Sequence, residues 1–251
     1  MKYARFSICI TPDPDSDLAR LGKHWLGWDI DQAVELPFLK VDNLKVSALS
    51  LTARVRRFGF HALLAPPFRL ANGHSPLDLH HTAQALAAHL EALEFPGLYL
   101  SAEDDQLALR PMGDLAPLHR LQHIADQVFD EYRAPPPPDA APQPRRRSEL
   151  SAQQMQVVIG ESLDPTKSER PFEFVLTEPR PRAEVTQLRQ KLLPILSPNL
   201  PRPFHVQSIT LCGEDQSGWF RVIQRYPLTG GLRTRAPDAP RLHTLVPQVP
   251  L

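Results

Sequence analysis

The fold is decided by residues 172–226, which read FEFVLTEPRPRAEVTQLRQKLLPILSPNLPRPFHVQSITLCGEDQSGWFRVIQRY. Residues 172–177 indicate a strand that is closed by a Glu-Pro dipeptide. Apolar residues at helical spacing then predict a helix that ends before Pro198. Two alternating segments, 204–212 and 219–226, flank the turn GEDQSG and indicate a pair of strands. We therefore expect a strand, a helix and two further strands in this order.

The first half of the chain repeats this order with additional elements. Ser75 is a suitable N-cap, Pro76 fits the first helical position, and apolar residues follow at four-three spacing as far as Leu93. In chain order we predict a strand at 3–11, helices at 17–28 and 43–57, a strand after Gly59, the helix that begins after Ser75, a hairpin of strands 97–101 and 106–110, and a helix at 118–132.

A strand, a helix and two strands make up most of a ferredoxin-like lobe. The sequence therefore predicts an α+β fold with two ferredoxin-like lobes, whose antiparallel sheets surround a shared central groove. We assign residues 1–133 to an N-terminal lobe, 134–149 (APPPPDAAPQPRRRSE) to a proline- and arginine-rich linker, 150–228 to a C-terminal lobe that opens with a helix at 150–159, and 229–251 to a flexible tail.

The composition excludes several classes of protein. The 251 residues carry 28 Lys+Arg and 28 Asp+Glu, so there is no overall basic field for nucleic acid or anionic lipid. No apolar run approaches the roughly 20 residues that span a bilayer, and the start of the chain is too short and too strand-like for a signal peptide. We expect a cytoplasmic protein with no membrane contact, in which Cys9 and Cys212 are reduced core thiols.

Several blocks of sequence, taken in order, resemble one known superfamily. These blocks are YARFSICITPDPDSDLARLGKHWLGWD, RRFGFHALLAPPFRL, PRRRSELS, FEFVLTEPRPRAE and FRVIQRYPL. Together they are similar to a branch of the two-histidine phosphoesterase superfamily that is often found with phosphonate-degradation genes. The resemblance covers about residues 3–228.

The resemblance implies a particular chemistry. In that superfamily two His-x-Thr or His-x-Ser motifs, one from each lobe, face each other across the groove and act on cyclic phosphates or 2′,5′-phosphodiesters. One imidazole takes a proton from the attacking oxygen and the other donates one to the leaving oxygen, while the hydroxyls hold the phosphate oxygens.

This chain departs from both motifs. The first motif appears as GFHALLA at residues 59–65, which keeps His61 but replaces the hydroxyl by Leu63 and a lysine by Ala65. The second appears as FEFVLTE at residues 172–178, where Glu173 replaces the histidine and Val175 the threonine. A glutamate with an ordinary pKa is ionised at neutral pH, so it can act as a base but scarcely as an acid, and it repels phosphate.

Three functional hypotheses follow. The first is a divergent phosphoesterase-like protein, impaired as a catalyst, that binds a phosphorylated small ligand in the groove. The second is an active phosphodiesterase that hydrolyses a cyclic phosphate or a phosphonate-pathway phosphosugar, with His61 as the base and a protonated Glu173 as the acid. The third is a non-enzymatic subunit that docks on another protein through the linker or the tail. Arg57, Arg69 and Thr177 are the candidate ligand-binding residues.

No other pattern indicates a cofactor, a metal or a second catalytic site. His119 and His123 have a spacing that can place two imidazoles on one metal, but no third ligand is evident. A glycine-rich phosphate loop and a Gly-x-Ser-x-Gly elbow are both absent from the sequence. We also find no basic strand with interleaved aromatic residues, which would indicate binding of single-stranded nucleic acid.

Overall fold

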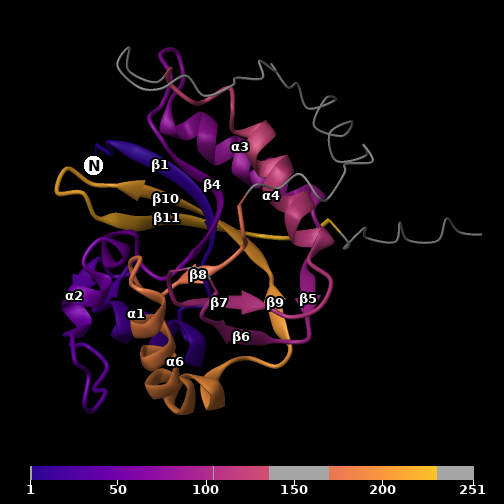
Figure 1. The fold of residues 1–251 in the computed structure, drawn as a ribbon. Coiled ribbons are helices and arrows are strands. Elements are labelled where there is room, and N and C mark those ends of the chain that lie inside the picture. The colour runs from indigo at the N-terminus through magenta and orange to yellow at the C-terminus, as the bar shows by residue number, and fades with distance from the viewer. Residues whose placement is uncertain (1, 104, 136–169, 231–251) are drawn as a thin grey trace, which may run out of the picture.

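The fold is taken from a computed structural model of the chain, which describes residues 2–103, 105–135 and 170–230 (Figure 1). Most of the predicted linker, the predicted helix at 150–159 and the tail beyond residue 230 lie outside the described residues. Within them, no helix is long and apolar enough to cross a membrane.

A seven-stranded antiparallel sheet forms the centre of the molecule, with the strand order β11-β10-β1-β4-β8-β7-β6 (Figure 1). The two halves of the chain are interleaved in this order, because β8 of the second half lies between β4 and β7 of the first. The expected α+β class with antiparallel sheets is confirmed, whereas the division into two lobes stays a prediction. The strands of this sheet are β1 (Arg5–Ile10), β4 (Ala62–Phe68), β6 (Leu98–Ser101), β7 (Ala108–Pro111), β8 (Phe174–Val175), β10 (Ser208–Glu214) and β11 (Phe220–Pro227).

Two short strand pairs lie outside this sheet. The pair of β2 (Trp28–Asp29) and β3 (Val34–Glu35) follows the first helix, and β5 (Leu93–Phe95) pairs with β9 (Phe204–Val206). The segment 204–212 was expected to be one strand, but it divides at Gln207 because its first part pairs with β5 and its second part with β1 and β11.

The two faces of β1 have different surroundings, which explains the alternation in its sequence. Phe6, Ile8 and Ile10 belong to the main hydrophobic core. Cys9 points to the opposite face, where it packs in a smaller buried cluster with Trp28 and other residues. Because side chains alternate along a strand, both faces of this part of the sheet are covered.

The helices are grouped at two ends of the sheet. In Figure 1, α3 (Pro76–His89) and α4 (Ala116–Val128) lie together, α4 against β4 and α3 against β10 and β11. At the other end are α1 (Asp17–Leu26), α2 (Ala48–Thr52) and α6 (Arg182–Leu196), with the 3₁₀ turns η1 (Val55–Phe58) and η3 (Ser197–Asn199).

Local sequence explains where α3 begins, and tertiary pairing explains where it ends. Ser75 and Asp78 form a reciprocal capping box, with Pro76 in the first turn as predicted. The predicted continuation to Leu93 is wrong, because the helix ends at His89 and Leu93 opens strand β5. Helical periodicity cannot reveal that this segment finds a partner strand more than one hundred residues later.

The predicted helix at 43–57 is also shorter than expected. Only α2 and η1 form in this segment. Between them, Arg54 N donates to the Glu178 carboxylate at 2.5 Å, a contact with a distant part of the sequence. Gly59 then adopts a φ of +73°, a left-handed conformation that suits glycine, and directs the chain into β4. This turn fixes the position of His61.

Candidate functional site

The two segments for which the resemblance predicts motifs, 59–65 and 172–178, lie side by side in the sheet. Ala62 of β4 is paired with Phe174 of β8 in the antiparallel register, and both side chains are fully buried in the main core. Continuing this register by one residue places Leu63 opposite Glu173 and His61 opposite Val175. Because side chains alternate, these four flanking positions share the face opposite the main core.

A hydrogen bond from Nδ1 of His61 leaves the other ring nitrogen, Nε2, as a hydrogen-bond acceptor. Its Nδ1 lies 2.9 Å from the Gly59 carbonyl oxygen, which can only accept, so Nδ1 carries the proton and Nε2 keeps a lone pair in the neutral ring. Burial lowers the pKa of His61, and the hydrogen bond to Gly59 opposes this only in part. The imidazole is therefore neutral at neutral pH, with Nε2 suited to accept a proton.

Glu173 is fully engaged with neighbouring side chains. One carboxylate oxygen accepts from Gln106 Nε2 at 2.7 Å and the other from Arg110 Nε at 2.8 Å. The side chain is only 8% exposed, and Arg110 makes a second ion pair with Glu103. Both oxygens of the Glu173 carboxylate therefore already accept hydrogen bonds from side chains of the protein.

Two residues beside His61 were not identified from the sequence. Continuing the β1–β4 register by one residue from the pair Ile10–Ala62 places Thr11 opposite His61. Thr11 Oγ1 accepts a hydrogen bond from Arg225 Nε at 3.0 Å, and the remaining guanidinium nitrogens of Arg225 pair with Asp31. In the sequence, no local spacing links Arg225 to His61. Its place in the block FRVIQRYPL is the one feature that could have drawn attention to it.

The three predicted ligand-binding residues occupy different places. Arg57 is exposed on η1, with its guanidinium carbon 6.0 Å from the centre of the Trp219 ring. Its neighbour in the sequence, Phe58, has its ring centre 6.3 Å from that of His61, whereas the printed contact of the Arg57 side chain is with Trp219. Arg69 follows the far end of β4. Thr177 is buried, and its hydroxyl oxygen accepts from Leu107 N at 2.9 Å.

The sequence of the chain identifies its family. Residues 63–221 match the family described as "Protein of unknown function (DUF1045)". The chain belongs to this family. The matched region of the DUF1045 chain includes Glu173 and begins two residues after His61.

Two curated relatives of this DUF1045 chain have the same name. The chain is 29% identical over 250 residues to "Ribose 1,5-bisphosphate phosphokinase PhnN" of Janthinobacterium sp. (strain Marseille), covering 95% of the chain and 54% of the relative. It is 31% identical over 137 residues to the protein of that name in Laribacter hongkongensis (strain HLHK9), covering 53% of the chain and 32% of the relative. The DUF1045 chain thus spans about half or less of these relatives.

One solved structure is similar to the DUF1045 fold at low identity. It is described as the crystal structure of a phosphoesterase and covers 91% of this chain and 99% of its own, with 12% identity and a TM-score of 0.36.

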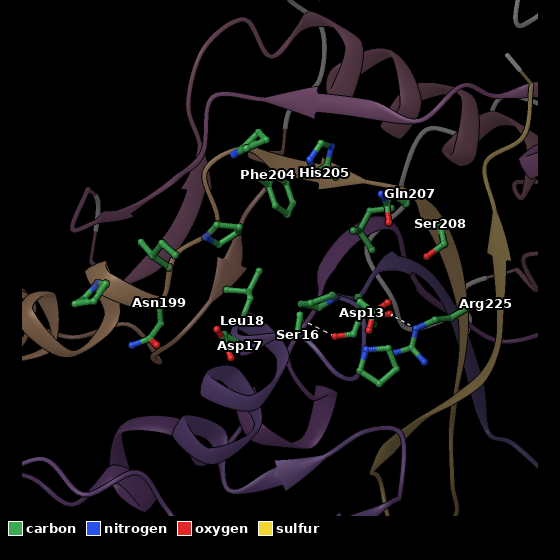
Figure 2. A pocket seen from close by; sticks show the side chains of 18 residues that line it. Asp13, Ser16, Asp17, Leu18, Asn199, Phe204, His205, Gln207, Ser208 and Arg225 are labelled. Atoms are coloured by element: carbon green, nitrogen blue, oxygen red, sulfur yellow. Dashed lines mark hydrogen bonds between the residues drawn. The ribbon is translucent and has the colours of Figure 1, made fainter.

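A cavity of about 440 Å³ lies close to Thr11 in the DUF1045 fold (Figure 2). It is bounded by the segment between β1 and α1, the segment between α6 and β9, and the beginning of β10. Thr11, Ser208 and Arg225 contribute polar groups to its wall, and Asp13 and Asp17 contribute carboxylates. His61 does not line it, so this cavity adjoins the motif residues without containing them.

Proposed function

We propose that this chain binds a phosphorylated sugar of the ribose phosphate class beside His61, and that it does not hydrolyse this ligand by a two-histidine mechanism. The observation that carries the proposal is the state of the two motif positions: His61 is prepared as an acceptor, while both oxygens of Glu173 are occupied by Arg110 and Gln106. A base is present beside the central strands, but the partner acid is not.

The loss of the hydroxyl groups supports the same proposal. Leu63 and Val175 stand at the positions where the two-histidine superfamily has hydroxyl side chains, and neither can donate to a non-bridging phosphate oxygen. Without those donors and a proton donor for the leaving oxygen, several of the interactions that stabilise the transition state are missing. Removing a single such donor typically lowers a rate by about 100-fold to 1,000-fold.

The remaining groups suit a sugar phosphate. A neutral His61 accepts a hydrogen bond from a sugar hydroxyl through Nε2. Among the described residues Arg57 forms no ion pair, so its exposed guanidinium is available to a phosphate. The name of the relatives supports the ligand class, since ribose 1,5-bisphosphate combines hydroxyls with phosphates.

The setting of the protein belongs to the proposal as well. We place it in the cytoplasm, as the sequence composition leads us to expect, and give it a role linked to phosphonate metabolism, as the sequence resemblance implies. We do not propose the phosphokinase activity of the relatives for this chain. The chain covers about half of the Janthinobacterium relative, and its sequence contains no glycine-rich phosphate loop.

The second candidate function is the hydrolase. It is favoured by the orientation of His61, whose hydrogen bond to Gly59 is the kind of support that a general base needs. It requires a proton donor, which Glu173 supplies only if the ion pair with Arg110 opens. The docking subunit remains a further prediction, because most of the linker and the tail lie outside the described residues.

Calorimetric titration with ribose 5-phosphate and ribose 1,5-bisphosphate tests the binding role. We expect His61→Ala and Arg57→Gln to weaken binding by about fivefold or more each, the effect of losing one hydrogen bond or charged contact. Arg54→Gln is the matched control, because it removes an exposed arginine three residues earlier and should leave the dissociation constant unchanged. Binding that is indifferent to both His61 and Arg57 would overturn the proposal.

Hydrolysis assays distinguish the two candidate functions. We expect no turnover of a 2′,3′-cyclic nucleotide or a cyclic phosphosugar by the wild-type protein. Turnover that disappears in His61→Ala and in Glu173→Gln would establish the hydrolase and refute the binding-only function. The Glu173→His variant restores the second histidine of the motif and shows whether its loss alone limits the chemistry.

A further inference from the structure

A second cavity, of about 240 Å³, lies between α6, α2 and the segment before α2. Leu51, Val185 and Leu188 form buried parts of its wall, and Leu44 and Val46 contribute partly buried apolar surface. These residues come from two segments far apart in the sequence, 44–51 and α6. The cavity is smaller than the 300–1,000 Å³ that is usual for drug-sized ligands, so it suits a compact molecule.

Positively charged side chains dominate the polar part of this lining. Lys45, Arg180 and Lys191 line the cavity together with one carboxylate, that of Glu184. Within the described ranges none of the three cations forms an ion pair: Arg180 donates to the Ser50 carbonyl at 2.7 Å, and Lys191 donates to a backbone carbonyl. Three cations against one carboxylate give the lining of the cavity a net positive charge among the residues that the structure describes.

Arg180 also has an unsatisfied donor. Its Nε is buried and has no hydrogen-bond partner, although buried polar groups are normally paired. A guanidinium that already donates through Nη2 and leaves Nε free is suited to receive an anionic oxygen. Thr177 lines the same cavity, and while its oxygen accepts from Leu107 N, its own hydroxyl proton remains available to a ligand.

We propose that this cavity binds a small amphipathic carboxylate, with its apolar body against the leucine and valine side chains and its carboxylate at Arg180. Lys191 retains ammonium protons beyond the one that it donates and adds a second charge contact. The site is independent of the proposed function, because His61, Glu173 and Arg57 are not among the residues that line it. It also gives Thr177 a place in ligand binding that is separate from the central motifs.

Calorimetric titration of the full chain with octanoate, and separately with octan-1-ol, tests this site. We expect octanoate to bind at least about tenfold more tightly than the alcohol, because only the acid offers an anion to Arg180. Arg180→Gln and Lys191→Gln should each weaken octanoate binding severalfold. Arg182→Gln is the matched control, since Arg182 is an exposed arginine at the start of α6, the helix that carries Lys191, and does not line the cavity.

The outcomes separate the possibilities. Weakening by Arg180→Gln and Lys191→Gln, with Arg182→Gln unchanged, supports the site. Equal binding of the alcohol and the acid, equal weakening by the control, or no octanoate binding by folded wild-type protein overturns it. Arg180 also donates a hydrogen bond to the Ser50 carbonyl, so thermal unfolding of each variant is measured to show that it folds. If Arg180→Gln does not fold, the result is taken from Lys191→Gln.

Discussion

Arg110 on β7 donates from Nε to the Glu173 carboxylate at 2.8 Å, which joins two neighbouring strands of the central sheet by a buried ion pair. The exposed fractions of the two side chains are 13% and 8%. Gln106 satisfies the other oxygen of the carboxylate. Glu173, for which the sequence resemblance predicts a place in a catalytic motif, thus connects β7 and β8.

We predict that Glu173→Gln destabilises the protein by about 1–3 kcal/mol, because it leaves Arg110 and Gln106 with an amide in place of a carboxylate. Urea unfolding measures the change. Glu103→Gln is the control, since Glu103 pairs with the same arginine but is 62% exposed, and its loss should change stability by less than about 1 kcal/mol. Equal effects of the two substitutions would contradict a structural role for Glu173.

The second prediction concerns the pH dependence that His61 contributes. Burial holds its pKa in the folded state below the ordinary value of 6.5, so the unfolded state binds the proton more readily. The neutral ring contributes fully to the free energy of unfolding at pH values above the pKa of the unfolded state. This contribution is lost as the pH falls through 6.5 towards the pKa of the folded state.

Urea unfolding at about pH 7.5 and about pH 5.5 tests this behaviour. Wild-type protein should lose more stability over this interval than His61→Gln, which has no titrating group at this position. A variant that loses as much stability as the wild type would show that His61 does not titrate differently in the folded protein.

Much of the fold could be predicted from local sequence because its signals are local. The capping box at Ser75 and the alternation of β1 depend on residues a few positions apart, and both elements form, with shorter bounds than predicted. The exchange of strands between the halves of the chain depends on pairings such as Leu93 with Val206, which no local pattern records. For that reason the sequence pattern places Leu93, the first residue of β5, in the preceding helix.

The candidate site shows the same limit. The resemblance identified His61 and Glu173, and the register places their motifs on neighbouring strands. The side chains that bind both oxygens of Glu173 are those of Gln106 and Arg110, which lie 67 and 63 residues away in the sequence. Their effect follows from the pairing of β7 with β8, and therefore from the fold as a whole.

The third prediction concerns the two cysteines. Cys9 and Cys212 are buried on neighbouring strands with their sulfur atoms 3.3 Å apart, and burial raises the pKa of the Cys9 thiol well above its ordinary value. A buried thiol with a raised pKa reacts slowly with disulfide reagents. We expect both to resist an aromatic disulfide reagent in the native protein and to react promptly in guanidinium chloride. Rapid native reaction of either thiol would contradict this packing.

The fourth prediction concerns the contact between α1 and the start of β4. A Cβ atom added at Gly22 would lie 2.1 Å from Cγ of Phe60, whose ring stacks on Phe174 with centroids 5.0 Å apart. Gly22→Ala therefore forces the ring next to His61 to move. We expect a net loss of about 1–3 kcal/mol, because overpacking outweighs the gain from replacing a helical glycine, which is about 1 kcal/mol or less.

A double-mutant cycle identifies the cause of that loss. In a Phe60→Leu background the alanine methyl group meets a smaller side chain, so Gly22→Ala should destabilise the protein less than it does in the wild type. The difference between the two backgrounds, measured by urea unfolding, is the energy of the clash. If Gly22→Ala has the same effect in both, the loss does not come from the Phe60 ring, and the close packing of α1 against the strand that carries His61 would be refuted.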